Sequence, residues 1–270
     1  MRAKKSLGQH FLKSEKALAQ IVEAGNIGPG DTILEIGPGE GVLTERLLAT
    51  GAHIIAIEKD RELIPILQEK FTKEIALKKL QLIEADVLKF DPSTIKDTYK
   101  LIANIPYYIT GAILEQFLST THQPEQIVLL IQKEVADRIV ARDGKQSVLS
   151  IAVSVYGTPS IVAKVPAGAF NPPPKVDSAI LSISTISRVF FSDLPAQAGC
   201  DEKLFFSVLK SIFGKKRKQI GSSLADYLHD KTKAVMVLSR LDIDRTVRPE
   251  TLSKKDWKKL VQEITNSVQF

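Results

Sequence analysis

Short apolar runs alternate with helical patterns through the first half of this chain, and the alternation restricts the folds open to it. The strand-like runs are rich in Ile, Leu and Val, and apolar residues recur with a helical period between them. Strand-like runs fall at 31–37, 53–60, 80–86, 99–106 and 126–133, and helical patterns at 41–50, 61–71 and 111–120. Such runs are typical of parallel strands covered on both faces. We therefore predict an α/β fold with a doubly wound sheet.

The pattern changes after about residue 145. Segment 146–156 fits a helix or a strand equally well, whereas 160–165 and 178–184 are strand-like. From about residue 187 helical patterns dominate, at 201–213, 224–229, 232–241 and 253–264. We predict a basic arm with a first helix (1–30), an α/β domain (31–186) and a small all-helical domain (187–270).

Charge is concentrated in the predicted helical domain. The whole chain has a formal net charge of +6, and residues 187–270 hold 16 Lys and Arg against 10 Asp and Glu. This segregation favours a neutral body with a basic appendage that faces a polyanion. The densest run is Lys215, Lys216, Arg217 and Lys218. It is a candidate for contact with nucleic-acid phosphates, although a short charge run is also typical of a solvated helix face.

Other features exclude several classes of protein. No apolar run approaches the roughly 20 residues that span a bilayer, and the amino terminus lacks the apolar core of a secretory signal. With a single cysteine, Cys200, no intramolecular disulfide can form, so we expect a cytoplasmic protein without a membrane partner. The histidines are scattered without metal-ligand spacing, and no metal is predicted.

A glycine-rich turn follows the first predicted strand of the sheet. Gly37, Gly39 and Gly41 allow backbone amides to approach a ligand without a Cβ in the way. A dinucleotide-binding fingerprint, G-x-G-x-x-G, requires glycine at residue 42, where this chain has Val42. The pattern that begins at Glu35, E-x-G-x-G-x-G, is instead the form seen in class I methyltransferases, which bind S-adenosylmethionine.

Two acids close the next two predicted strands. Glu58 is placed to accept hydrogen bonds from both hydroxyls of a ribose. Asp86 is placed to accept one from an adenine amino group, while Val87 or Leu88 packs on the ring. Ligands of open α/β sheets bind outside the carboxyl ends of the strands. This ordered set predicts a nucleotide-type cofactor, against the alternative of a structural turn with incidental surface acids.

The fourth strand closes with an amide, a proline and two tyrosines. An adenine amine is a poor nucleophile, and the Asn104 side-chain oxygen with the Pro106 carbonyl would hold its two hydrogens and aim its lone pair at a methyl donor. Tyr107 would stack on the base. The alternative is a tight proline turn whose tyrosines anchor a loop. DNA adenine methyltransferases have N-P-P-Y or D-P-P-Y here, so Ile105 is a departure.

A second aromatic candidate stands on a proline-rich loop. Phe170 precedes Pro172, Pro173 and Pro174, and its ring would sandwich a base drawn from its stack. A phenylalanine at such a position is also compatible with a core role.

Together these motifs resemble the KsgA family of rRNA adenine N6,N6-dimethyltransferases. The resemblance covers most of the chain and rests on "KKSLGQHFL", "LEIGPGEGVLT", "AIEKD", "EADVLKFD", "NIPYYIT", "FNPPPKVDSAIL" and "FGKKRKQIGSSL". It implies a Rossmann-like, seven-stranded class I methyltransferase domain with a helical carboxyl-terminal domain. The implied cofactor residues are His10, Leu12, Gly37, Glu58, Asp86 and Asn104, and the implied target-base residues are Asn104, Pro106, Tyr107 and Phe170.

The family's activity is what the resemblance implies for function. Its members methylate two adjacent adenosines in the 3′-terminal hairpin of 16S rRNA, within the immature 30S subunit, and loss of this methylation confers kasugamycin resistance. We expect the protein to act as a monomer. His10 stands where some members have Asn, and Tyr108 where some have Asn or His, which affects detailed contacts.

Three alternatives stay open at this point. An Erm-type enzyme shares N-I-P-Y and methylates a large-subunit rRNA adenine, although "FGKKRKQIGSSL" with a long helical tail resembles the small-subunit enzyme. An assembly factor, or a relative of a mitochondrial transcription factor, would keep the fold while catalysis is secondary. A nicotinamide dehydrogenase is the third, against which Val42 argues.

Overall fold

The computed structural model of the chain describes residues 4, 8–192, 202–215 and 218–268, and Cys200 therefore lies outside the described residues. The chain divides into two compact units, one of residues 1–137 and 157–186 and one of residues 138–156 and 187–270. This division differs from the predicted domains in two segments: 1–30 groups with the sheet instead of standing apart, and 138–156 groups with the helical unit. The reason is aromatic packing: the Tyr156 ring contacts Phe191 and Phe206 at centroid distances of 5.4 and 6.1 Å.

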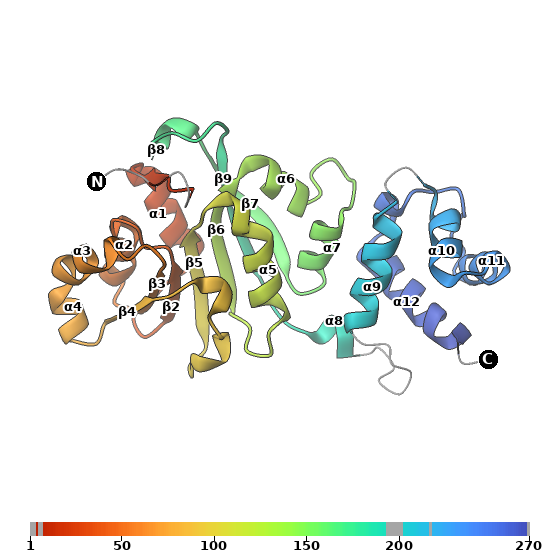
Figure 1. Cartoon of the computed structure of the whole chain (residues 1–270), viewed down its shortest axis with the longest axis horizontal. Coiled ribbons are helices and arrows are strands. Elements are labelled where there is room, and N and C mark those ends of the chain that lie inside the picture. Colours follow the sequence, from red (N-terminus) through yellow and green to blue (C-terminus); the bar gives the residue numbers. More distant parts are fainter. Residues whose placement is uncertain (1–3, 5–7, 193–201, 216–217, 269–270) are drawn as a thin grey trace. The chain divides into compact units, whose positions relative to one another are not determined.

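The first unit contains the sheet. Its strands are β2 (Thr32–Ile36), β3 (His53–Glu58), β4 (Leu80–Glu84), β5 (Tyr99–Asn104), β6 (Gln126–Gln132), β7 (Thr158–Val165) and β9 (Ser178–Ser184). They form one seven-stranded sheet in the order β4-β3-β2-β5-β6-β9-β7 (Figure 1). The first five strands in this order, from β4 through β3, β2 and β5 to β6, are parallel. Strand β9 is antiparallel to both β6 and β7. The predicted doubly wound, seven-stranded α/β sheet is confirmed.

Both faces of the sheet are buried, as runs of Ile, Leu and Val require. The helices of this unit are α1 (Glu15–Ala24), α2 (Val42–Ala49), α3 (Leu63–Lys70), α4 (Thr72–Ala76), α5 (Thr110–Ser119) and the start of α6 (Lys133–Ile139). The 3₁₀ turns are η2 (Val87–Lys89), η3 (Pro92–Thr94), η4 (Tyr107–Ile109) and η5 (Ala167–Ala169). Helices α1, α2 and α3 share one core cluster with Ile33, Ile102 and Val128. The alternate strand residues Leu34 and Leu101 are equally buried, since successive side chains point to opposite faces.

A second, two-stranded sheet joins the amino-terminal arm to the proline-rich loop. Strand β1 (Phe11–Leu12) pairs antiparallel with β8 (Phe170–Asn171), so that Leu12 lies opposite Phe170. This pairing was not predicted, because two residues are too few for a sequence pattern.

The regular elements in the described part of the second unit are all helices or 3₁₀ turns. Its helices are α7 (Val148–Ser154), α8 (Val189–Ser192), α9 (Glu202–Phe213), α10 (Ile220–Leu228), α11 (Lys231–Arg240) and α12 (Lys254–Val268), with the 3₁₀ turn η7 (Pro249–Thr251). Trp257 is fully buried, and its ring stacks on Phe213 at a centroid distance of 5.3 Å. The ambiguous segment 146–156 forms α7, which begins with a capping box between Ser147 and Ser150. In the described ranges no helix has the length and apolarity that a membrane crossing needs.

The tight turn before α2 gives a test of stability. Gly41 caps α2 with a left-handed φ of 74°, and a Cβ there would lie 2.5 Å from Phe71 Cε2. Gly41→Ala is therefore expected to lower the free energy of unfolding by about 3 kcal/mol, through backbone strain and overpacking. Gly111→Ala is the control, because a Cβ there meets nothing within 4 Å. Urea unfolding of the two variants measures the difference. Equal unfolding midpoints for Gly41→Ala and Gly111→Ala would contradict the prediction.

Candidate functional site

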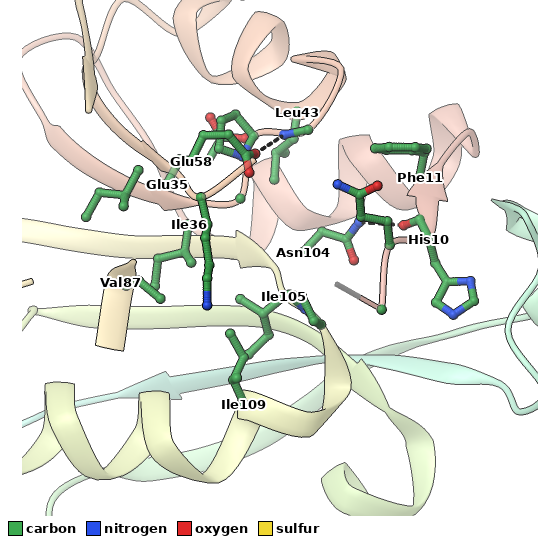
Figure 2. A pocket seen from close by; sticks show the side chains of 18 of the residues that line it. His10, Phe11, Glu35, Ile36, Leu43, Glu58, Val87, Asn104, Ile105 and Ile109 are labelled. Atoms are coloured by element: carbon green, nitrogen blue, oxygen red, sulfur yellow. Dashed lines mark hydrogen bonds between the residues drawn. The ribbon is translucent and has the colours of Figure 1, made fainter. Parts of the chain in front are cut away.

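A pocket opens in the first unit at the carboxyl ends of four neighbouring strands. Strands β4, β3, β2 and β5 are adjacent and parallel, so their ends lie along one edge of the sheet. Ten predicted site residues line this pocket: His10, Leu12, Gly37, Gly39, Glu58, Asp86, Val87, Asn104, Pro106 and Tyr107. Figure 2 shows Glu35 and Glu58 together at one end of the pocket, with Asn104 and His10 at the other.

The glycine turn is fixed against the end of β3. Gly37 and Gly39 have φ angles of 67° and 61°, a region that side chains disfavour. The Gly39 N–H donates to Glu58 Oε2 at 3.1 Å, and a Cβ on Gly39 would lie 3.2 Å from the Phe11 ring. The turn therefore brings bare backbone to the pocket wall and is anchored by the predicted ribose-binding acid.

Glu58 and Asp86 are held differently. Burial raises the pKa of Glu58, although the N–H groups of Asp60 and Gly39 donate to its carboxyl and oppose that rise. Asp86 ends the loop after β4, and its ion pair with Lys59 at 2.8 Å holds the pKa of that carboxyl below its usual range. The Leu88 N–H donates to the other Asp86 oxygen at 3.1 Å. Both carboxyl groups are thereby oriented before any ligand binds.

Sequence reasoning missed Asp60, which ties the amino-terminal arm to the end of β3. Its side chain is 4% exposed and accepts from Lys4 Nζ at 2.7 Å and from Gln9 Nε2 at 2.9 Å. Burial works against ionisation, but these two donors hold the pKa of Asp60 below its usual range. Asp60 stands two residues after Glu58, and this position could have marked it as a site residue. Its partners Lys4 and Gln9 lie more than fifty residues away, so the local sequence did not indicate its contact with the arm.

Asn104 is held so that its amide has one defined orientation. Its Nδ2 donates to the His10 carbonyl at 3.3 Å (Figure 2), which turns Oδ1 away from that contact. The neighbouring acceptor, the Pro106 carbonyl, takes one hydrogen bond from the Ile109 N–H at 3.2 Å. A carbonyl oxygen has two lone pairs, so the Pro106 oxygen retains capacity for a second donor.

Tyr107 is held at its hydroxyl and along one face of its ring. Its hydroxyl lies 2.7 Å from the Ser178 hydroxyl, and burial raises its pKa. The His10 ring lies beside it at a centroid distance of 6.0 Å and an interplanar angle of 17°, and His10 Nδ1 is 2.7 Å from the Pro172 carbonyl oxygen. His10 therefore covers part of one face of Tyr107. Ser178 was not predicted, since a serine at the start of a strand is common.

Phe170 differs from its predicted place. Its side chain is 4% exposed and belongs to the core cluster, outside the residues that line the pocket. The cause is the β1–β8 pairing, which sets Phe170 opposite the equally buried Leu12. In this arrangement Phe170 packs the arm against the body. Its position agrees with the core role that was the alternative to base stacking.

Carboxyl groups dominate the charge of the pocket. Among the described residues that line it, the acids Glu40, Glu58 and Asp86 outnumber a single lysine, Lys59, without counting the buried Glu35. A set of this sign suits a cationic ligand and opposes the pyrophosphate of a dinucleotide. The nicotinamide alternative is therefore disfavoured on the charge of the site as well as on Val42. In the ranges that the structure describes, no group of His, Cys, Asp and Glu is arranged to hold a metal.

Comparison with known proteins decides the family. The model of a family described as ribosomal RNA adenine dimethylase matches residues 1–266. The chain belongs to the ribosomal RNA adenine dimethylase family. Members of this family are methyltransferases, and the predicted enzyme class is confirmed.

Individual relatives of this dimethylase agree with that assignment. A ribosomal RNA small subunit methyltransferase A from Dehalococcoides mccartyi is 43% identical over 267 residues, covering 97% of this chain and 89% of the relative. Another of that name, from Thermosynechococcus vestitus, is 39% identical and covers 95% of both chains.

Solved structures place the fold in the same group. A dimethyladenosine transferase from Plasmodium falciparum is 26% identical with a TM-score of 0.80, covering 96% of this chain and 98% of that one. The 23S rRNA methyltransferase ErmE is 25% identical with a TM-score of 0.74, covering 94% and 98%. Both neighbours carry the class I methyltransferase fold that the resemblance implied.

The basic run of the dimethylase lies in the second unit and is only partly described. Lys215 and Lys218 both form ion pairs with Asp226, whose pKa lies below its usual range because of them. Lys216 and Arg217 lie outside the described residues. One carboxylate thus offsets part of the charge predicted to contact phosphates.

Glu35 is the most unusual acid of the pocket. It is 1% exposed, and neither carboxyl oxygen has a hydrogen bond of normal geometry within the described residues. Burial raises the pKa of Glu35 from 4.5 to about 8, with the Thr44 hydroxyl opposing and the Glu58 carboxyl adding to the rise. Glu35 is consequently protonated in the folded protein at neutral pH and ionised in the unfolded chain.

This difference predicts a pH dependence of stability. A group whose pKa is raised by folding binds more protons when folded, so stability falls as pH rises from the unfolded value of 4.5 to about 8. We expect Glu35→Gln to flatten this fall by up to about 1.4 kcal/mol per pH unit. Urea unfolding at a series of pH values measures this dependence in the wild type and in Glu35→Gln. Burial also raises the pKa of Glu58, which adds the same pH dependence to both proteins. Parallel curves for the two proteins would contradict the expected titration of Glu35.

Proposed function

We propose that this dimethylase transfers methyl groups from S-adenosylmethionine to N6 of two adjacent adenosines in the 3′-terminal hairpin of 16S rRNA. Its substrate is the immature 30S subunit, and the enzyme acts as a monomer in the cytoplasm. The observation that supports this most is the placement of Asn104 and Pro106, two hydrogen-bond acceptors, in one pocket with the glycine turn and Glu58. The names of the curated relatives favour the small subunit.

The pocket fits S-adenosylmethionine on the chemistry of its own groups. Two backbone-anchored carboxyl groups, Glu58 and Asp86, suit the ribose hydroxyls and the adenine amine, and Val87 supplies an apolar wall. The excess of carboxyl groups suits the sulfonium and ammonium charges. The turn at Gly37 and Gly39 admits the chain of the methionine moiety. When bound, the cofactor supplies an electrophilic methyl group.

The residues of the chain orient the acceptor amine. Asn104 Oδ1 and the Pro106 carbonyl oxygen accept its two hydrogens and bring the nitrogen lone pair toward the donor methyl. An amine held in this way would become cationic when methylated, and its surplus proton would then be lost to water. Tyr107 stacks on the base with its open face, since His10 and Ser178 fix its ring.

Two other functions compete with this one. The Erm alternative has support from the fold of ErmE at 25% identity, but the curated relatives, at 36% to 43% identity, are named for the small subunit. The assembly-factor alternative predicts a degraded acceptor site, whereas Asn104, Pro106 and Tyr107 line one pocket.

A methylation assay tests the proposal. Under-methylated small subunits are incubated with the protein and labelled S-adenosylmethionine, and the modified bases are mapped. We expect N6,N6-dimethyladenosine at two adjacent positions of the 3′-terminal hairpin. Methylation of large-subunit rRNA instead would favour the Erm alternative, and the absence of methyl transfer from both subunits would favour an assembly factor.

The basic run yields a separate prediction on RNA binding. Replacing Lys215, Lys216, Arg217 and Lys218 with glutamine is expected to weaken binding to small-subunit rRNA. The slope of log K against log salt should flatten by about 0.7–0.9 for each phosphate that the variant no longer neutralises. Asp226→Asn is the matched control, because it frees Lys215 and Lys218 from their ion pairs and should steepen the slope. An unchanged slope in the glutamine variant would mean that the run is only solvated.

A further inference from the structure

Tyr108 stands apart from the other residues of the pocket. It is 66% exposed, and it is the single aromatic residue among the exposed large hydrophobic side chains of the described residues. It lines the pocket from η4, directly after Tyr107. The two adjacent tyrosines are therefore used differently, with Tyr107 held inside by Ser178 and Tyr108 presented at the rim.

The arm passes beside the Tyr108 ring on one side. A Cβ on Gly8 would lie 3.4 Å from Tyr108 Cε1 and 3.5 Å from Tyr108 Cδ1, and Gly8 has a left-handed φ of 62°. The bare backbone of Gly8 thus runs beside the ring. A neighbouring backbone restricts the orientations of a ring, and a restricted ring loses less conformational entropy when it stacks on a ligand.

The rim is where a second base has to be accommodated. Drawing one base into a pocket breaks its stacking on both neighbours, and the adjoining bases stay within one nucleotide of the pocket mouth. An exposed aromatic ring at that place can replace the lost stacking, and it does so for any base, because every base has a π-face. Single-stranded RNA loops are commonly held in this way.

We propose that Tyr108 is a stacking platform for the RNA base that flanks the target adenosine. This role rests on the proposed function and deepens it, because it extends the binding site from one nucleotide to two. Tyr108 then contributes to substrate affinity, while Asn104 and Pro106 act on the amine.

The test pairs Tyr108→Ala with Tyr108→Phe, since phenylalanine keeps the ring. With under-methylated small subunits, the alanine variant is expected to raise KM about tenfold with little change in kcat, and the phenylalanine variant to behave as wild type. A hairpin RNA with 2-aminopurine beside the target adenosine gives a second readout. Its fluorescence should be quenched by the wild-type protein and by Tyr108→Phe, but not by Tyr108→Ala.

The outcomes separate this inference from the proposed function. If the wild-type protein methylates the subunits and Tyr108→Ala keeps the wild-type KM and quenching, the platform is refuted and the proposed function stands. An increase in KM that Tyr108→Phe shares would refute stacking as its cause. A wild-type protein that leaves the subunits unmethylated refutes both.

Discussion

Replacing Asn104 with alanine is expected to reduce methyl transfer by at least about a thousandfold while the chain keeps its fold. The variant loses the side-chain oxygen that holds one hydrogen of the amine, and with it the aim of the nitrogen lone pair. It also loses the Nδ2 bond to the His10 carbonyl, which joins the arm to β5. Single-turnover rates with under-methylated small subunits measure the effect.

Asn104→Asp is the informative companion. It keeps an acceptor oxygen toward the amine but cannot donate to the His10 carbonyl, so its rate should fall between those of wild type and Asn104→Ala. Cofactor binding and the unfolding midpoint show whether each variant is intact. Near-normal turnover of Asn104→Ala would remove this residue from the mechanism.

Glu58→Gln is expected to weaken cofactor binding about 100-fold. Each carboxyl oxygen of Glu58 accepts a backbone N–H, from Gly39 at 3.1 Å and from Asp60 at 2.8 Å. A glutamine must turn its amide nitrogen toward one of these donors, which disturbs the glycine turn and removes an acceptor for the ribose. Calorimetry with S-adenosylhomocysteine measures the loss.

Glu62→Gln is the matched control for this substitution. Glu62 has the same chemistry and lies four residues further along, but it is 66% exposed and its carboxyl pairs with Lys4. Its cofactor affinity should stay within about twofold of wild type, since exposed ion pairs contribute little. Equal affinities for the wild type and Glu58→Gln would show that Glu58 does not hold the ribose.

The sheet and the strand-end residues were predictable because each depends on local sequence. Hydrophobic runs set the strands, and the ends of adjacent parallel strands must meet, so Glu58 and Asn104 follow from chain order alone. The helical unit followed from periodicity in the same way. Segment 146–156 was ambiguous by period, although Ser147 and Ser150 held the capping signal that makes it a helix.

The features that could not be predicted depend on contacts between distant segments. The β1–β8 pairing joins residues about 160 positions apart, and it decides that Phe170 packs in the core. Asp60 likewise finds its partners in the amino-terminal arm, and Tyr107 finds its partner at Ser178, both through contacts between distant segments. The periodicity of hydrophobic residues in the sequence does not indicate any of these contacts.

The central claim is that Asn104 and Pro106 hold the adenine amine by two hydrogen bonds. A crystal structure with S-adenosylhomocysteine and a single-stranded RNA that contains the target adenosine tests it most directly. We predict the adenine N6 at hydrogen-bond distance, about 2.7–3.2 Å, from both Asn104 Oδ1 and the Pro106 carbonyl oxygen. We also predict the adenine ring parallel to that of Tyr107. An ordered adenosine whose N6 meets neither oxygen, with S-adenosylhomocysteine in the pocket beside Glu58, would contradict it.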